Sequence, residues 1–279
     1  MLFKNSVDAV IPTLDGKKIY ETINSLYSGK VKPKNTYCVY YKKFDFKKFK
    51  KFKNIFFIKS KKKGQIEQRN LGIKKCKSNL ILQLDDDIVL EKNTLFSLIN
   101  SLKICGNNSA VGPAFFDQLK KYIYNSQDNF LSNLYKLLIC SAPYGSKKNG
   151  KITPLTLAYG VEISKKKKLK KVDWLPGGCA LYDKKIASIN FKKFPFRGKA
   201  YCEDIYYSIQ RKNQKVQHYV DLKAKVITER SLNSKDFTEF LKEIKVRKYL
   251  LNFTKGSKIL FLNWVFFEFL NRFFFKKIF

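Results

Sequence analysis

The sequence predicts an α/β fold, in which helices flank a mostly parallel central sheet, followed by a C-terminal helical appendage rich in aromatic residues. Short apolar runs alternate with segments of helical periodicity through residues 1–230, the arrangement that builds parallel sheets with right-handed crossovers. One of these runs, Leu80–Leu84, leads directly into three aspartates, and open α/β sheets bind ligands at the carboxyl ends of their strands. From residue 231 the alternation stops, so we expect one domain over residues 1–230 and a helical segment over residues 231–279.

Apolar spacing predicts each element in turn. Residues 7–11 form an apolar run that ends at Pro12, which indicates the first strand, and residues 17–28 carry Ile19, Ile23 and Leu26 at helical spacing before Gly29. The same criteria predict further strands at residues 36–41, 54–58, 80–84, 109–116, 179–182, 215–219 and 223–227. They predict further helices at residues 65–76, 94–103, 129–139, 203–212 and 235–251. Residues 143–171 lack periodicity and are rich in Lys, Gly, Ser and Pro, which predicts a long loop of the kind that carries function.

Asp85, Asp86 and Asp87 form the most informative motif of the chain. Three adjacent anions repel one another, whereas a hard divalent cation takes carboxylate oxygens as ligands. One interpretation is therefore a metal held beside an anionic ligand at the end of the strand. The alternative is a solvated turn, with Asp87 capping a helix that begins near Ile88.

The composition limits the classes of function. A net charge of +35, from 57 basic and 22 acidic residues, attracts nucleic acid, phosphates or acidic lipid headgroups. Nucleic-acid binding also requires a motif, and the chain has no zinc-finger spacing, no bZIP heptads and no RNP-like aromatic strand, so we expect no specific nucleic acid partner. His218 is the only histidine, which argues against most histidine metal sites and against Ser-His-Asp catalysis. Carboxylates remain as the groups that could carry chemistry.

Cysteine usage indicates a reducing compartment. The six cysteines include no Cys-x-x-Cys pair, and Asp8 interrupts the first apolar stretch, which is unlike a signal peptide. Free thiols in the cytoplasm are the simplest account.

The last apolar stretch, residues 259–275, has two interpretations. It is short for a bilayer span and is interrupted by Asn263, Glu268 and Arg272. It could pack on the preceding domain, or it could lie in a membrane interface with Trp264 and the phenylalanines buried among lipids. The large apolar residues among lysines favour the membrane interface, and with it a peripheral location on the inner face of the cell membrane.

Five separated motifs occur along the chain in a characteristic order. They are Ile11-Pro12-Thr13, Gln68-Arg69-Asn70-Leu71-Gly72, Leu84-Asp85-Asp86-Asp87, Trp174-Leu175-Pro176-Gly177-Gly178 and Glu203-Asp204. In this order and spacing the chain resembles the family 2 glycosyltransferases, which have the Rossmann-like GT-A fold. The resemblance covers residues 7–229.

The resemblance implies a role for each matching residue. It implies donor binding by Pro12, Thr13, Arg69, Asn70 and Asp85. It implies that Asp87, together with Asp85, holds the metal, Mg²⁺ or Mn²⁺. It implies a wall facing donor and acceptor at Trp174, Gly177 and Gly178, and a catalytic base at Asp204 with Glu203 beside it.

Two departures from the family pattern affect binding. The second strand reads Cys38-Val39-Tyr40-Tyr41-Lys42, without the acidic residue that usually holds the nucleotide base, so Tyr40 or Tyr41 could stack on the base instead. No histidine follows the last strand; Glu229 or water would complete the metal shell there. The Gln-x-x-Arg-Trp motif of processive members is also absent, which favours a single sugar addition per encounter.

The function implied is an inverting, metal-dependent transfer of a sugar from a nucleotide-sugar to a lipid-linked or cell-envelope saccharide, at an anionic membrane surface. A non-catalytic module that binds nucleotide-sugars or other anionic ligands is the alternative, because the second-strand acid is missing. A nucleotidyltransferase is a further alternative, but it would need a Gly-rich, Arg-containing loop after the first strand, and residues 11–16 do not supply one.

Overall fold

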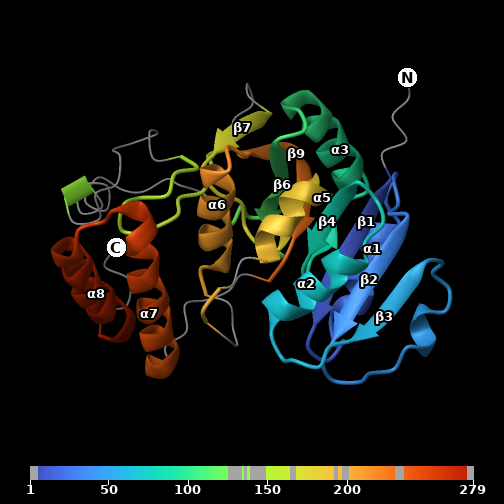
Figure 1. Ribbon diagram of the computed structural model, residues 1–279, viewed down its shortest axis with the longest axis horizontal. Helices are drawn as coiled ribbons and strands as arrows, with labels where there is room; N and C mark the ends of the chain where they lie inside the picture. Colours follow the sequence, from blue (N-terminus) through green and yellow to red (C-terminus); the bar gives the residue numbers. More distant parts are fainter. Residues whose placement is uncertain are drawn as a thin grey trace.

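A nine-stranded sheet forms the centre of the molecule (Figure 1). The computed structural model describes residues 6–124, 134, 137–138, 149–163, 168–191, 194–196, 201–229 and 236–274. The strands are β1 (Val7–Thr13), β2 (Asn35–Tyr40), β3 (Ile55–Lys59), β4 (Leu80–Leu84), β5 (Val89–Leu90), β6 (Ser109–Phe116), β7 (Leu169–Val172), β8 (Cys179–Asp183) and β9 (Gln217–Ile227). Their order is β3-β2-β1-β4-β8-β6-β9-β5, and β7 pairs with β9. This mixed α/β architecture confirms the predicted fold class.

The helices cover both faces of the sheet and extend beyond one end of it. They are α1 (Ile19–Tyr27), α2 (Gln65–Lys75), α3 (Thr94–Cys105), α5 (Lys184–Ala187), α6 (Glu203–Asn213), α7 (Phe237–Thr254) and α8 (Lys258–Phe273), with short 3-10 turns η1 (Lys47–Phe49) and η3 (Ser188–Phe191). The predicted helix 129–139 falls largely outside the described residues. β5, β7 and α5 are too short for apolar periodicity to reveal them.

The strand pairing changes from parallel to antiparallel at β8. β1 runs parallel to β2 and β4, and β2 runs parallel to β3, whereas β8 is antiparallel to both β4 and β6. The register pairs Val10 with Gln83. Three residues further along both strands, this register sets Thr13 opposite Asp86, so the first turn and the acidic triplet meet at one edge of the sheet.

β9 is one strand, where the sequence predicted two at residues 215–219 and 223–227. Its register against β6 shifts between Pro113 and Ala114, which pair with Asp221 and Lys225. Such a bulge inserts extra residues while both halves stay hydrogen-bonded. Asp221 is buried at this irregularity and accepts hydrogen bonds from Ser97 Oγ (2.6 Å) and Ser101 Oγ (2.8 Å) of α3.

Helix α2 lies unusually close to the sheet because of Gly72. A Cβ atom at Gly72 would lie 2.4 Å from Val10 Cγ1 and 3.1 Å from Val39 Cγ2, closer than carbon atoms pack. The glycine therefore lets α2 pack directly on β1 and β2, and this contact sets the position of Arg69 one turn earlier.

The C-terminal hairpin of α7 and α8 packs on the domain through one face. Val246 and Leu250 of α7 join a buried cluster with Ile205 and Ile209 of α6. The interpretation of Trp264 as a membrane-buried residue is wrong, because its side chain is 6% exposed and packs with Leu155 and Leu251. These packing partners lie in the 149–163 segment and on α7, and their spacing in the sequence does not show that they contact Trp264.

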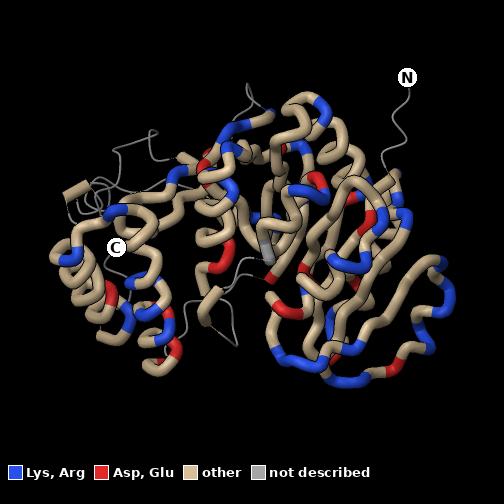
Figure 2. The backbone as a smooth tube through the Cα atoms, viewed as in Figure 1, with Lys and Arg blue, Asp and Glu red and all other residues tan. Residues whose placement is uncertain are grey.

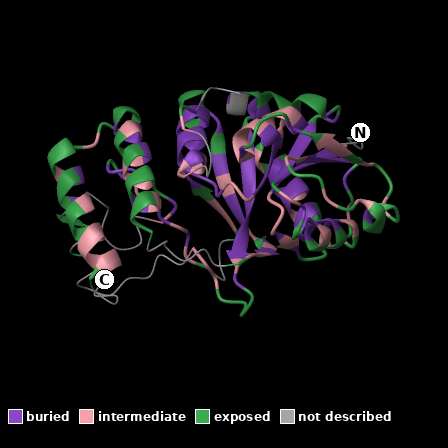
Figure 3. Cartoon of the chain, turned by 90° about the horizontal axis from the view of Figure 1, so that it is seen from below, coloured by how far each residue is buried: buried purple, intermediate pink, exposed green. Residues whose placement is uncertain are grey.

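The opposite face of α8 is exposed (Figure 3). Ile259, Leu262 and Phe266, at helical spacing, are 73%, 66% and 58% exposed. Within the described residues, no helix has both the length and the apolar character needed to cross a bilayer.

Trp264→Ala should lower the free energy of unfolding by about 3–5 kcal/mol, because it empties a buried aromatic site. Leu262→Ala, on the exposed face of the same helix, should change it by less than about 0.5 kcal/mol. Urea denaturation followed by circular dichroism measures both. Equal, small effects would show that α8 does not pack on the domain in solution.

Candidate functional site

Three of the five motifs meet around one buried cation. Arg69, on α2, is 3% exposed. Its Nη2 lies 2.8 Å from Asp85 Oδ1 and its Nη1 lies 2.6 Å from Glu203 Oε1. Gln65, one turn earlier on α2, also donates to Asp85 Oδ1, at 2.8 Å. The carboxyl end of β4, the helix α2 and the first turn of α6 are thus joined by charge-assisted hydrogen bonds.

Burial and pairing act on these groups in opposite directions. Burial alone would lower the pKa of Arg69, but Glu203 and Asp85 outweigh it and raise that pKa, so the guanidinium is firmly charged. Burial raises the pKa of Glu203, and the attraction of Arg69 opposes this rise. Removing one partner of such a buried pair leaves an uncompensated charge, which is far more costly than the pair itself.

Asp204 lies beside this pair but does not share its cation. It is half-buried at the start of α6, and its Oδ1 accepts a hydrogen bond from the Ile205 N–H at 2.9 Å. Burial raises the pKa of Asp204, while Arg247 of α7 and Arg69 partly offset the rise. Asp204 is therefore a more basic carboxylate than an exposed one.

Gly177 and Gly178 let the strands and α6 approach closely at the site. A Cβ atom on Gly177 would lie 3.3 Å from Glu203 Oε1 and 3.6 Å from Asp204 Cβ. A Cβ atom on Gly178 would lie 3.5 Å from Asp85 Oδ2, and the Gly178 carbonyl accepts a hydrogen bond from Asp85 N at 2.8 Å. Side chains here would fill the space between the acids of β4 and those of α6.

A cavity of about 540 Å³ opens at the carboxyl ends of β1 and β4. It is lined by Pro12, Thr13, Leu14, Lys63, Gly64, Gln65, Gln68, Asp86 and Lys242. Thr13 Oγ1 donates a hydrogen bond to Asp86. Burial raises the pKa of Asp86 to about 6, against the opposing hydrogen bond from Thr13. The sequence predicted no role for Asp86, yet this aspartate and not Asp85 lines the cavity.

Asp87 points to a different cavity, of about 460 Å³, on the α1 side. Glu229 also lines this cavity, where it forms an ion pair with Lys18. Burial raises the pKa of Asp87, and Asp85 and Glu229 raise it further while Lys18 lowers it. Two carboxylates, Asp85 and Glu229, thus add their negative charge to that of Asp87 against the single charge of Lys18, an environment that favours a cation.

A divalent metal fits these residues in one specific way. Among the described residues, no group of three or more His, Cys, Asp or Glu side chains could enclose a metal ion. Mg²⁺ is commonly held by one or two carboxylates, with water and substrate phosphate completing its shell. Asp87 and Asp85 Oδ2, to which no described residue donates a hydrogen bond, suit that mode, whereas Glu229 is already paired with Lys18.

Two predicted site residues lie outside this group. Trp174 is 7% exposed, and its Nε1–H donates to the Tyr159 carbonyl at 2.8 Å, so its side chain is held in the interior. Asn70 is half-buried, and the described residues offer its Oδ1 no hydrogen-bond donor. It is not among the described residues that line the cavity.

Sequence reasoning missed several residues of the site. Gln65 could have been found, because it lies four positions before Arg69 on the same helical face. Gln68 stands directly before Arg69 in the motif, but the sequence assigned it no role. Gln68 Nε2 donates to the carbonyls of Thr13 (2.5 Å) and Val39 (2.7 Å), which fixes the turn after β1. Lys242 on α7 gave no signal, since only the fold of the C-terminal hairpin carries it to the cavity.

Known proteins share the family pattern and the fold. The model of "Glycosyl transferase family 2" matches residues 43–189. The structure of GalNAc-T7 with UDP, GalNAc and Mn²⁺ has a TM-score of 0.59 at 12% identity, covering 87% of this chain and 47% of that one. S. aureus TarS 1-349 in complex with UDP-GlcNAc has a TM-score of 0.58 at 14% identity, covering 96% and 72%. Identities this low establish the GT-A fold alone, and this chain spans about half the length of the GalNAc-T7 chain. No curated protein sequence matches.

Arg69→Gln should lower the free energy of unfolding at pH 7.5 by about 3–5 kcal/mol, because Glu203 and Asp85 lose their cation. Without Arg69 the folded-state pKa of Glu203 should rise further above its unfolded value. The stability that Glu203 contributes in its protonated form is then lost as pH rises. The difference in free energy of unfolding between the variant and the wild type should therefore shrink as pH falls toward 5. Thermal denaturation across this pH range, with the exposed Lys75→Gln as control, measures it. A pH-independent deficit would contradict the electrostatic account.

Proposed function

Because the chain belongs to glycosyl transferase family 2, we propose that it transfers a sugar from a nucleotide-sugar donor to a saccharide or lipid-linked acceptor. One observation carries this proposal: the cavity at the ends of β1 and β4 adjoins the acidic triplet, while Asp204 stands across the Gly177–Gly178 wall. The two structures with this fold named above hold UDP with GalNAc and UDP-GlcNAc. A uridine diphosphate sugar is accordingly the first donor to test.

The cavity supplies groups suited to such a donor. Asp86 can accept hydrogen bonds from ribose hydroxyls, and the ammonium groups of Lys63 and Lys242 give its rim positive charge for phosphates. Pro12 and Thr13 form the backbone turn beneath it. Arg69 does not reach the cavity; we assign it to holding Asp85 and Glu203 in place.

Asp87, with Asp85, would hold Mg²⁺ or Mn²⁺ against the donor diphosphate. When bound there, the metal neutralises the charge that builds on the leaving diphosphate.

Asp204 is our candidate for the general base. The acceptor oxygen bonds to the anomeric carbon as the bond from that carbon to the diphosphate breaks, and the hydroxyl proton passes to a carboxylate oxygen of Asp204. The bond electrons leave with the diphosphate, and one direct displacement inverts the anomeric centre. Glu203 is less suited to accept the proton because Arg69 is bonded to it. The raised pKa of Asp204 suits a base.

The acceptor side is proposed from the surface of the hairpin. The exposed apolar stripe of α8 is formed by Ile259, Leu262 and Phe266. A stripe of this kind fits the headgroup boundary of a membrane, where a lipid-linked acceptor is found. A peripheral position on the cytoplasmic face of the cell membrane follows.

Incubation with a panel of nucleotide-sugars, Mn²⁺ and lipid-linked acceptors should give transfer or hydrolysis of one donor.

Asp204→Asn should lower kcat at least about 100-fold with little change in donor affinity, because general-base catalysis contributes about that factor or more. Asp87→Asn should weaken Mn²⁺-dependent nucleotide binding. In the wild type, the acid limb of kcat/KM should lie above the ordinary aspartate pKa of about 4. Metal-dependent nucleotide binding without turnover of any donor would instead indicate a binding module.

Lys242→Gln should raise KM for the donor about two- to fivefold and leave kcat unchanged, since an exposed ammonium provides modest binding that is equal in ground and transition states. Lys242 also lies 3.3 Å from Glu239 Oε1, which keeps its side chain at the cavity rim. Steady-state kinetics against Lys248→Gln, on another side of α7, makes the comparison. Identical KM values for the two variants would remove α7 from the donor site.

A further inference from the structure

The chain between the end of β2 and the start of α2, which includes β3, concentrates positive charge to an unusual degree. Residues 42–63, hereafter the basic loop, contain eleven lysines and one acidic residue, Asp45. Figure 2 shows this concentration of lysines around β3. All eleven lysines are exposed, and within the described part of the chain no ion pair neutralises any of them. Asp45 is itself engaged, since its Oδ1 accepts a hydrogen bond from the Lys47 N–H at 2.8 Å.

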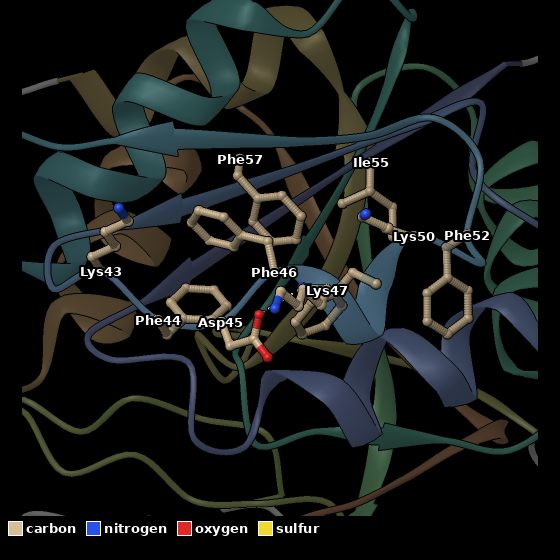
Figure 4. Close-up of a pocket in the computed structure, with 10 residues that line it drawn as sticks. Lys43, Phe44, Asp45, Phe46, Lys47, Lys50, Phe52, Ile55 and Phe57 are labelled. Carbon is tan, nitrogen blue, oxygen red and sulfur yellow. Dashed lines mark hydrogen bonds between the residues drawn. The ribbon is translucent and has the colours of Figure 1, made fainter.

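Aromatic side chains form a hollow within the basic loop. A cavity of about 500 Å³ is bordered by Phe44, Phe46, Phe52, Ile55 and Phe57, all partly exposed, over the buried Phe49. Figure 4 shows the rings of Phe44, Phe46 and Phe57 gathered together, with Lys43 to one side. Phe46 stacks on Phe57 with ring centroids 4.5 Å apart. The hollow is thus a preformed apolar surface.

The lysines stand around this apolar floor. Lys43, Lys47 and Lys50 line the hollow. Nearby, Lys51 Nζ lies over the ring of Phe52, 5.0 Å from its centroid. Long lysine stems over apolar groups, with the ammonium groups in water, are the arrangement that snorkelling side chains adopt at a membrane interface.

We propose that the basic loop is a docking surface for an anionic phospholipid bilayer. The lysines contact headgroup phosphates, and the hollow of phenylalanines receives the upper part of an acyl chain. Charge complementarity selects this occupant: a soluble phosphate would not use the apolar floor. A nucleic acid would need exposed rings arranged for base stacking, whereas Phe46 and Phe57 already stack on each other. The surface is separate from α8 and, apart from Lys63, from the cavity at the ends of β1 and β4.

Flotation with vesicles of equal parts phosphatidylglycerol and phosphatidylcholine tests the proposal. Changing Lys43, Lys47 and Lys50 together to Gln should weaken binding roughly 100-fold, because each lysine near an anionic surface contributes about a factor of five. The matched control changes three exposed lysines elsewhere, Lys103, Lys120 and Lys121, to Gln and should bind nearly as the wild type does. Pure phosphatidylcholine vesicles should not bind, and high salt should release the protein.

A second readout follows insertion itself. In Phe46→Trp, the new indole should shift its emission to shorter wavelength with the anionic vesicles and not with inorganic phosphate, while Trp174 and Trp264 stay buried. A third variant, Leu262→Ser with Phe266→Ser, separates the contribution of α8.

Equal vesicle binding by the two lysine variants, or loss of binding only in the α8 variant, would overturn the proposal. So would tight binding of single-stranded RNA with no vesicle binding. Donor turnover on a soluble acceptor should be the same in the wild type and both lysine variants, so failure of the transferase proposal is seen separately.

Discussion

The guanidinium of Arg69 is the interaction on which the candidate site depends. It is nearly inaccessible to water, and it bonds Asp85, the residue directly after β4, to Glu203, the first residue of α6. A charge in that position is tolerated only because two carboxylates meet it with good geometry. Gly72 makes this arrangement possible, since it allows α2 to pack against Val10 and Val39 and so carries Arg69 to the level of the acids.

In this arrangement the five carboxylates of the site have different contacts and different proposed roles. Asp85 and Glu203 are held by Arg69 and shape the site. Asp86 lines the cavity with Thr13, and Asp87 turns toward α1. Asp204 stands beside the glycine wall, and within the described residues no cation is bonded to it, while its burial raises its pKa.

The C-terminal hairpin has two different faces, and the difference has consequences for function. One face packs on α6 and on the 149–163 segment, and from it Lys242 reaches the cavity rim while the charge of Arg247 acts on Asp204. The other face leaves apolar residues in solvent. The hairpin thus contributes to the candidate site through one face and presents an exposed apolar surface on the other. With the basic loop at the other end of the sheet, these are the two surfaces that we propose to contact a membrane.

Some of this was determined by the sequence alone. The alternation of strands and helices, the position of Asp85–Asp87 after β4, and the glycine pair before β8 are local patterns, set by hydrophobic periodicity and by neighbouring residues. The tertiary structure decided the rest. The contacts of Arg69 with Glu203, of Thr13 with Asp86 and of Trp264 with Leu155 join residues far apart in the chain. Helical periodicity shows that a face is apolar but not what covers it. For α8, packing buried Trp264 and left Phe266 exposed, a choice that depends on the partner surface and not on the helix.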